Sequence, residues 1–437
     1  MSTKQVIMVG FTLFAMFFGA GNLIFPPALG FGSGEYFWTA MLAFVLTGVG
    51  LPLIGVIVGS ISKDGYKESL KHIHPAFGVA FLVAIYLTIG PFFAIPRTAT
   101  TAYEMAIVPF LSENTGIWLL VFSLAFFIIV LLLSLKPGTL INTIGQVLTP
   151  LLLIGIVLLI IVAGIAYFSN SINPASATFQ ESSPFTIGFT EGYLTMDAIA
   201  AIAFSVLVLN SIRQLGITNR RDLLIGTIKS ALLAAALLGA IYISLGWLAN
   251  RVDLGGALVD DQNLGTFLLT YMSSDVFGIF GPILLGVIVF LACITTGTGL
   301  IVSVSEYFNS ILPKVPYKLW VVVFTLISFG LANQGLDQVI ATSVPILSII
   351  YPIAMTTVLL LIVTYFLPSP RLSLQIPVYV VTALSILSVL HRNGWMEMSW
   401  LESLPLFSYS FEWIPFMIVG YILGYLIGLK KPRVEYT

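Results

Sequence analysis

The chain has 437 residues, of which 58% are hydrophobic and only 8% are charged, and its formal net charge is −1. Soluble domains carry about 25% charged residues, so this composition excludes an aqueous fold and indicates an integral protein of the lipid bilayer. The balanced charge offers no basic patch for nucleic acid, and the single cysteine, Cys293, excludes an intramolecular disulfide.

Apolar windows of about 20 residues predict an all-α polytopic membrane protein with twelve transmembrane helices. The predicted spans are 6–29, 36–60, 76–108, 116–135, 138–168, 186–214, 222–249, 276–309, 316–332, 338–367, 373–391 and 411–429. Three of them, 76–108, 138–168 and 276–309, are longer than a bilayer about 30 Å thick requires, so they should tilt, protrude or bend. Pro91 and Pro96 give the first of these three a reason to bend.

The distribution of Lys and Arg predicts the orientation of these helices. With a cytoplasmic N-terminus, all but three of the 18 Lys and Arg residues fall in inner loops or the C-terminal tail. The positive-inside rule therefore favours the helix count and places both termini in the cytoplasm. The first span, 6–29, is too long for a signal peptide and has no cleavage site, so we expect it to be retained. The segment 255–272 is too polar to span and should lie over the outer mouth as a short helix.

The first predicted helix is interrupted at Gly19–Asn22, shortly before Pro26 and Pro27. Small residues let the backbone unwind and let a ligand approach it closely. The half-helix ends would then offer amides to a carboxylate and free carbonyls to a small cation. The alternative is that the glycines only pack helices and the prolines only kink one. Gly, Asn and a Pro pair so close together favour the broken helix.

The predicted span 186–214 is interrupted in a similar way, between Glu191 and Asp197. Asp197 lies near the middle of the span, where a carboxylate costs about 2.5–3.5 kcal/mol. Such a residue usually faces a cavity and serves an ion, a proton or a substrate. It could also cap the helix that begins at Ala198, and the two roles are compatible. Two breaks in corresponding halves of a chain indicate the central site of a transporter.

Two further groups of polar residues lie within predicted spans. Thr295 and Thr296 are adjacent hydroxyls at mid-membrane depth, which suits a dehydrated Na⁺, although such hydroxyls also bond their own helix. Arg97 and Glu104 fall toward the outer end of the third helix. They could gate an outer vestibule as charged groups, or they could simply reach toward the interface.

Several function classes are excluded by what the sequence lacks. It has no phosphate-binding loop for ATP hydrolysis, no Cys and His spacing for a transition metal and no catalytic constellation. Repeated polar rings, which a passive channel would need, are also missing. We therefore expect a secondary transporter, not an enzyme, with no organic cofactor.

The motifs Phe17 to Pro27, Gly90 to Arg97, Gly192 to Ala200 and Thr295-Thr296 together resemble the bacterial branched-chain amino acid:cation symporters of the BrnQ type, over essentially the whole chain. The resemblance implies Na⁺-coupled uptake of leucine, isoleucine and valine across the bacterial cytoplasmic membrane, without an obligate protein partner. Another neutral solute, or H⁺ coupling through Asp197, is the alternative within transport.

The resemblance also implies a LeuT-like fold with discontinuous helices 1 and 6. In that arrangement two inverted five-helix repeats, 1–168 and 186–367, are followed by two extra helices within 373–429. One Na⁺ would lie between helices 1 and 8. Its shell would be the carbonyls of Ala15, Phe18 and Ala292 and the hydroxyls of Thr295 and Thr296.

The resemblance further implies a substrate site at the two breaks. The substrate carboxylate would meet the amides of Gly19, Ala20 and Gly21, while Asn22 and Thr195 fall where a second sodium site would be. Asp197 departs from the neutral residue that is usual at this position in LeuT itself, so it is expected to bind the substrate ammonium or to cap the half-helix. The other expected substrate contacts are Phe93, Tyr193 and Leu300.

Overall fold

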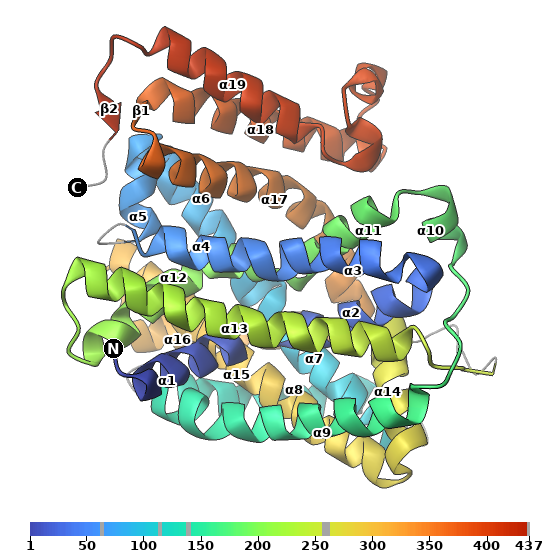
Figure 1. Cartoon of the computed structure of the whole chain (residues 1–437). Helices are drawn as coiled ribbons and strands as arrows, with labels where there is room; N and C mark the ends of the chain where they lie inside the picture. The colour runs from blue at the N-terminus through green and yellow to red at the C-terminus, as the bar shows by residue number, and fades with distance from the viewer. Residues whose placement is uncertain (62–64, 112–115, 137–140, 256–262, 435–437) are drawn as a thin grey trace.

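The computed structural model describes residues 1–61, 65–111, 116–136, 141–255 and 263–434. Its long helices run in roughly one common direction, which is horizontal in Figure 1. Within the described residues, nine helices are long and apolar enough to cross a membrane, and shorter apolar helices accompany them at Thr3–Phe17, Tyr317–Ala332 and Trp413–Ile427. This confirms an all-helical polytopic membrane protein.

Up to residue 167, the described residues form nine α-helices and several short 3₁₀- and π-helical turns. The α-helices are α1 (Thr3–Phe17), α2 (Ala20–Ser33), α3 (Phe37–Val45), α4 (Leu51–Gly59), α5 (Tyr66–Ser69), α6 (Pro75–Leu87), α7 (Ala94–Ala106), α8 (Gly116–Ser134) and α9 (Thr149–Tyr167). The turns are η1 (Gly34–Tyr36), η2 (Leu46–Gly50), η3 (Leu70–His72), η4 (Thr88–Phe92), η5 (Val108–Phe110) and η7 (Ile141–Leu148).

After residue 167, the described part of the chain forms ten α-helices, three short turns and one pair of very short strands. The α-helices are α10 (Ala177–Glu181), α11 (Pro184–Glu191), α12 (Asp197–Gln214), α13 (Arg220–Ala249), α14 (Leu264–Phe277), α15 (Phe280–Ile311), α16 (Tyr317–Ala332), α17 (Leu336–Phe366), α18 (Arg371–Arg392) and α19 (Trp413–Ile427). The others are η8 (Gly192–Thr195), η9 (Ser399–Ser403), η10 (Phe407–Tyr409) and the antiparallel strands β1 (Ser369–Pro370) and β2 (Arg433–Val434).

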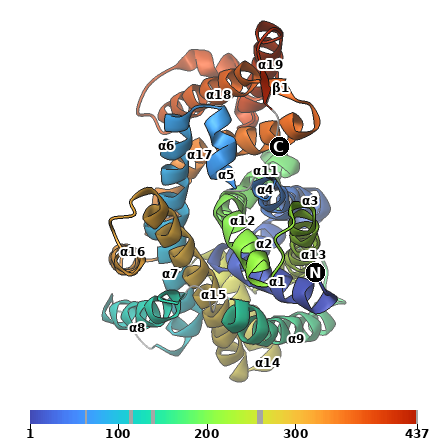
Figure 2. The same cartoon turned by 90° about the vertical axis from the view of Figure 1, so that its left-hand side faces the viewer.

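The arrangement places the broken helices at the centre. Helices α1 and α2 pack against α13, α12 packs against α4, and α15 packs against α7. Helices α18 and α19 lie together at one end of the molecule, and α17 connects them to the rest (Figures 1 and 2). At the opposite end, α8 and α9 expose many large apolar side chains, among them Ile117, Leu132 and Ile165. Such a surface suits lipid and would be costly in water.

Both predicted interruptions are present. The first break is at Phe18 and Gly19, where the backbone leaves the helical region and Gly19 is extended with φ −126° and ψ −153°. The second break follows η8 at Met196, which has φ 65° in the left-handed region. A non-glycine residue in that region is strained by about 1–3 kcal/mol, and such strain concentrates at functional sites.

Most predicted spans match observed helices with small shifts at their ends, and the clearest difference is in 255–272. Residues 256–262 of this segment lie outside the described residues. From Leu264 onward the segment is the start of α14, which continues to Phe277. Helix α14 begins after Asn263, whose side chain caps its first turn. Span 138–168 also begins outside the described residues and is observed as η7 and α9.

The predicted bend in 76–108 is confirmed at Pro91 but not at Pro96. Gly90 has non-helical backbone angles inside η4, and α7 starts anew at Ala94. Pro96 is the third residue of α7, where its missing N–H removes no intrahelical hydrogen bond. A proline at that position is therefore tolerated without a bend.

Candidate functional site

A small cavity lies where the two breaks meet α7 and α15, and we call it the central cavity. Its volume is about 20 Å³, and its walls include Gly19–Asn22, Arg97, Thr195–Asp197, Thr296 and Leu300. This space holds about one water molecule. The structure therefore shows the two breaks packed closely around a nearly closed centre.

The first break is held in shape by Asn22. The extended Gly19 donates its backbone N–H to the Asn22 side-chain oxygen over 3.1 Å, which caps the start of α2. Pro26 and Pro27 lie one turn later inside α2 and have no N–H to offer to the carbonyls of Asn22 and Leu23. The local sequence thus favours a half-helix in which some first-turn carbonyls accept no hydrogen bond from the backbone of the same helix.

Asn22 also connects the two breaks. Its side-chain N–H group donates to the carboxylate of Asp197 and to the hydroxyl of Tyr242, which comes from α13. The Tyr242 hydroxyl donates to the same Asp197 oxygen over 2.9 Å. Asn22 and Asp197 are both buried. A buried carboxylate needs such donors because it has lost its hydration.

This geometry bears on the capping role weighed for Asp197, while its functional role stays a prediction. The residue is the first of α12, yet its carboxylate bonds to Asn22 and Tyr242, and no side-chain cap is formed at the start of α12. The capping expectation is therefore wrong, and the carboxylate faces the central cavity. Tyr242 was missed by the sequence analysis; the only signal for it is a phenol hydroxyl deep in an apolar helix.

Arg97 is the second charged group of the central cavity, and only 3% of its surface is exposed. Its Nη1 donates to the Leu194 carbonyl over 2.7 Å, and its Nη2 donates to the Thr195 carbonyl over 3.3 Å. These bonds tie α7 to the second break. Its Nε has no hydrogen-bond partner among the described residues. Burial also excludes the interpretation that Arg97 extends to the membrane interface.

Arg97 also lies against the first break. Its guanidinium stacks on the Phe25 ring at 5.4 Å, and a methyl group added at Gly21 would come within 2.7 Å of its Nη2. A glycine is needed at that position because any side chain would meet the guanidinium. The central cavity is thus lined by a cationic side chain on α7 and an acidic side chain on α12.

Most predicted substrate residues line the central cavity, but two do not. Gly19, Ala20, Gly21, Asn22, Thr195, Asp197 and Leu300 are in its wall. Tyr193 faces away from it, stacked on Tyr351 at 4.4 Å, and Phe93 lies at the bend before α7 outside the wall. Aromatic residues near a break were expected to contact the ligand, but the turn η8 points Tyr193 to the other side.

The predicted Na⁺ ligands come together where α1 ends beside α15. The Ala15 carbonyl accepts from the Thr295 hydroxyl at 3.0 Å and from the Thr296 hydroxyl at 3.1 Å, and Thr295 also donates to the Ala292 carbonyl at 2.9 Å. The Ala15 carbonyl is available because Gly19 donates to Asn22. The carbonyl of Phe18 has no such contact, although the residue itself is buried at the break.

These oxygens suit a small hard cation. Two carbonyls and two hydroxyls from α1 and α15 gather within hydrogen-bond distance, and freed carbonyls at a helix break are typical Na⁺ ligands. At the second expected sodium site, the Asn22 side-chain oxygen accepts from the Gly19 N–H and the Thr195 hydroxyl donates to the Gly192 carbonyl, and this site stays a prediction.

Glu104 lies apart from Arg97. It accepts a hydrogen bond from Thr266 on α14 at 3.2 Å, and within the described ranges neither Glu104 nor Arg97 takes part in an ion pair. The acidic residues expected above them include Asp260 and Asp261, which lie outside the described residues, so the outer gate stays a prediction. Arg97 lies about two turns earlier in α7 and is held by the carbonyls of Leu194 and Thr195 at the second break.

A larger cavity of about 360 Å³ opens on the side where α12 and α15 end. Ala203, Leu207 and Ser303 line it, whereas Phe204 and Leu300 line the central cavity. Phe204 packs edge-on against Phe17 at 5.2 Å. Both rings of this aromatic pair line the central cavity, and neither lines the larger one.

Comparison with known sequences gives one consistent family. The family described as "Branched-chain amino acid transport protein" matches residues 2–431. A putative branched-chain amino acid carrier protein of Staphylococcus aureus strain USA300 is 52% identical over 442 residues and covers 99% of both chains. The corresponding putative carrier of Staphylococcus saprophyticus is 52% identical over 438 residues, with 98% of both chains covered.

Solved structures with a similar fold are transporters of the LeuT type. A Na⁺-coupled sialic acid symporter superposes with a TM-score of 0.64 at 18% identity, over 98% of this chain and 91% of that chain. MhsT in complex with L-phenylalanine gives a TM-score of 0.59 at 15% identity, over 97% of this chain and 98% of that one. At this identity the likeness shows the fold alone.

Proposed function

Because the chain belongs to the branched-chain amino acid transport protein family, we propose that it takes up leucine, isoleucine and valine by Na⁺-coupled symport. As a member of this family it is a multi-pass membrane transporter and not an enzyme. The proposed location is the bacterial cytoplasmic membrane, with both termini in the cytoplasm, as the distribution of Lys and Arg favours.

The proposed architecture is twelve spans in a LeuT-like arrangement. Two inverted five-helix repeats, 1–168 and 186–367, are followed by two extra helices within 373–429. The two breaks, in α1–α2 and in α11–α12, support this proposal because they occupy corresponding places in the two repeats. The similar solved structures support it as well, since they share this fold.

The observation that carries the substrate proposal is that two opposite charges, Arg97 and Asp197, line the same central cavity. An amino acid is a zwitterion, and Asp197 on α12 and Arg97 on α7 complement its ammonium and its carboxylate. The α2 amides of Ala20 and Gly21 lie beside Arg97 and add positive partial charge at the carboxylate. We assign Arg97 to this role in place of an outer gate.

The side chain of the substrate would meet the apolar part of the same wall. Met16, Phe204 and Leu300 line the cavity beside the polar groups. A missing or added methylene in such a pocket changes binding by about 1–3 kcal/mol. Leucine, isoleucine and valine should therefore share the site, with modest differences in affinity.

Substrate entry requires the central cavity to widen, because its present volume of about 20 Å³ holds no amino acid. The bonds of Arg97 to Leu194 and Thr195 join α7 to the second break, so their release lets the two walls separate. The guanidinium then exchanges the two carbonyls for the substrate carboxylate. On the other side, the Phe17–Phe204 pair must part for the solute to reach the larger cavity.

Na⁺ is the proposed coupling ion, held by Ala15, Ala292, Thr295 and Thr296. Binding there would fix the end of α1 against α15 and so order the first break before the substrate arrives. Coupling of this kind requires Na⁺ to bind one conformational state of the protein better than the other, because an ion with equal affinity for both states shifts no equilibrium.

A transport assay in proteoliposomes tests the choice of ion. With an inward Na⁺ gradient and no pH gradient, leucine should accumulate, and replacing Na⁺ by K⁺ should abolish the accumulation. Undiminished leucine accumulation driven by a pH gradient without Na⁺ would instead assign the coupling to protons, with Asp197 as the buried acid.

A further inference from the structure

A separate cavity of about 270 Å³ lies among α11, α17, α18 and the chain that leads into α19. It adjoins the second break from the side opposite to the central cavity. Tyr193 and Leu194 line this cavity, whereas Thr195 and Asp197 line the central one. The turn η8 is therefore a wall common to both, and we call the second space the lateral cavity.

Four buried polar groups around the lateral cavity have no hydrogen-bond partner among the described residues. They are the hydroxyls of Tyr193, Ser385 and Ser388 and the indole N–H of Trp413. Ser385, Ser388 and Trp413 are each less than 5% exposed. Native proteins rarely leave such groups unsatisfied, so four around a single space indicate that its occupant completes them.

The two serines lie on one face of α18, because they are three residues apart. A serine or threonine within a helix commonly bonds the carbonyl one turn back, as Thr382 on the same helix does to Val378 at 2.7 Å. Ser385 and Ser388 make no such bond. Both residues line the lateral cavity.

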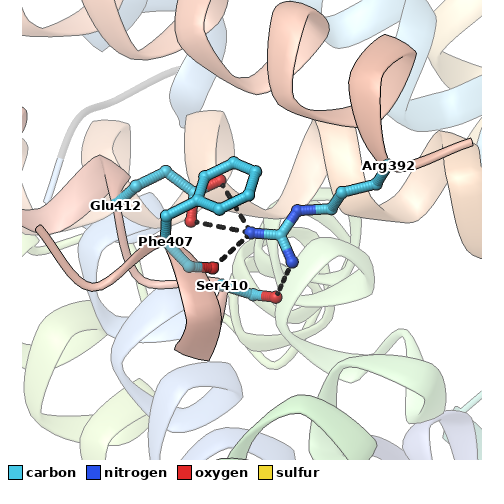
Figure 3. A network of polar contacts seen from close by, with 4 residues as sticks. All are labelled: Arg392, Phe407, Ser410 and Glu412. Atoms are coloured by element: carbon cyan, nitrogen blue, oxygen red, sulfur yellow. Dashed lines mark hydrogen bonds and ion pairs between the residues drawn. The ribbon is translucent and has the colours of Figure 1, made fainter. Parts of the chain in front are cut away.

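The charged groups of the lateral cavity leave one carboxylate unmatched. Figure 3 shows that the Arg392 guanidinium is paired with Glu412: it donates to both oxygens of that carboxylate, and also to Ser410 at 2.8 Å and to the Phe407 carbonyl at 2.6 Å. Glu191 also lines the cavity, and it has no hydrogen bond or ion pair with any described residue. The cavity thus offers an unpaired anion to a cationic group.

We propose that the lateral cavity is a second binding site for a neutral aliphatic amino acid. The ammonium pairs with Glu191, and the carboxylate accepts from Ser385, Ser388 and the Trp413 indole. The aliphatic side chain packs on an apolar wall that includes Leu347 and Leu384.

Other ligand classes fit less well. A simple anion would be repelled by Glu191, and an apolar molecule would leave the four polar groups unsatisfied. A lone metal cation would match Glu191 but not the Trp413 N–H, which can only donate. An aliphatic amino acid offers an ammonium to Glu191, a carboxylate to the polar donors and an apolar side chain to the apolar wall.

Equilibrium binding of radiolabelled leucine to the purified full-length protein, in saturating Na⁺, tests this site. The proposal of a second site rests on the proposed function only because leucine is used as the probe. The wild-type chain should bind two leucines. Ser385→Leu fills the cavity and should reduce this to one, whereas Thr382→Leu, one turn earlier on α18 and outside the cavity wall, should still bind two.

Glu191→Gln keeps the shape of the cavity and removes only its charge, so it decides the question if Ser385→Leu does not fold. It should weaken one of the two leucine sites at least tenfold and leave the other unchanged. One leucine per wild-type chain, with isotherms unaltered by Ser385→Leu and Glu191→Gln, would overturn the second site and leave water or Na⁺ as the occupant. No leucine binding at all would reject the proposed function as well.

Discussion

The side-chain amide of Asn22 donates to the carboxylate of Asp197, and this hydrogen bond joins two chain breaks that are 175 residues apart in the sequence. Asn22 shapes the first break by capping Gly19, while Asp197 begins the half-helix after the second. A change at either break is therefore transmitted directly to the other. This contact gives a physical basis for coupling the Na⁺ ligands at the first break to the substrate charge at the second.

Tyr242→Phe should weaken leucine binding by about tenfold, or about 1.4 kcal/mol. The hydroxyl donates to Asp197 at 2.9 Å, and its loss leaves the buried carboxylate with fewer donors and a less fixed position. Tyr271→Phe is the matched control, because that hydroxyl bonds the exposed Asp253 carbonyl. Concentration dependence of leucine uptake measures both variants, and equal, wild-type affinities would show that Tyr242 does not position Asp197.

Arg97→Gln should remove the preference of the central site for ligands that carry a carboxylate. Leucine affinity should fall by about 100-fold, since a charge-assisted pair contributes about 2–3 kcal/mol. Leucinol, which has the same side chain and ammonium but no carboxylate, should lose much less. Competition against labelled leucine binding gives both values, and Arg251→Gln, whose guanidinium stacks on Trp247 at 4.1 Å, is the control. An equal loss for both ligands would make Arg97 a structural or gating residue instead.

Thr296→Ala should raise the Na⁺ concentration required for half-maximal uptake by about tenfold, or about 1.4 kcal/mol. Its hydroxyl lies 3.1 Å from the Ala15 carbonyl and would serve only the ion. Leucine affinity measured at saturating Na⁺ should therefore stay near the wild-type value. Thr298→Ala removes a hydroxyl from the same helix that has no partner among the described residues. If both variants respond to Na⁺ like the wild type, Thr296 does not bind the ion.

Gly19→Ala should impair transport through the same ion site. A methyl group on Gly19 would lie 2.8 Å from the Thr296 hydroxyl oxygen and 2.9 Å from its methyl carbon. Because both contacts are too close, either Thr296 or the break must move. Gly330→Ala on α16 meets nothing within 4 Å and serves as the control. Initial rates of leucine uptake at several Na⁺ concentrations should show a loss that high Na⁺ partly restores; wild-type rates would mean that the break tolerates the shift.

Local patterns were sufficient to predict much of this fold. Apolar windows located the spans, and small residues beside Pro26 and Pro27 located the first break, because these signals act over a few residues. Pro96 was misjudged because its effect depends on its place in the helix. The helix α7 starts again after the bend, and that start depends on the non-helical Gly90.

The partners of the site residues could not be predicted from local patterns. Arg97 and Asp197 were each recognised as unusual charges in an apolar span, but their positions depend on how α7, α12 and α13 pack. The phenol of Tyr242 reaches Asp197 from a helix without any polar pattern around it. Tyr193 turns away from the central cavity because η8 and the left-handed Met196 set the direction of that segment.

The central claim is that Na⁺ and the amino acid bind at connected breaks, and the affinity of the purified protein for leucine at a series of Na⁺ concentrations tests it most directly. Linkage requires that an ion which favours the substrate-binding state raises the affinity for substrate. We expect the dissociation constant for leucine in the central site to fall by at least about tenfold between Na⁺-free and saturating conditions. A leucine dissociation constant that is the same with and without Na⁺ would contradict the account.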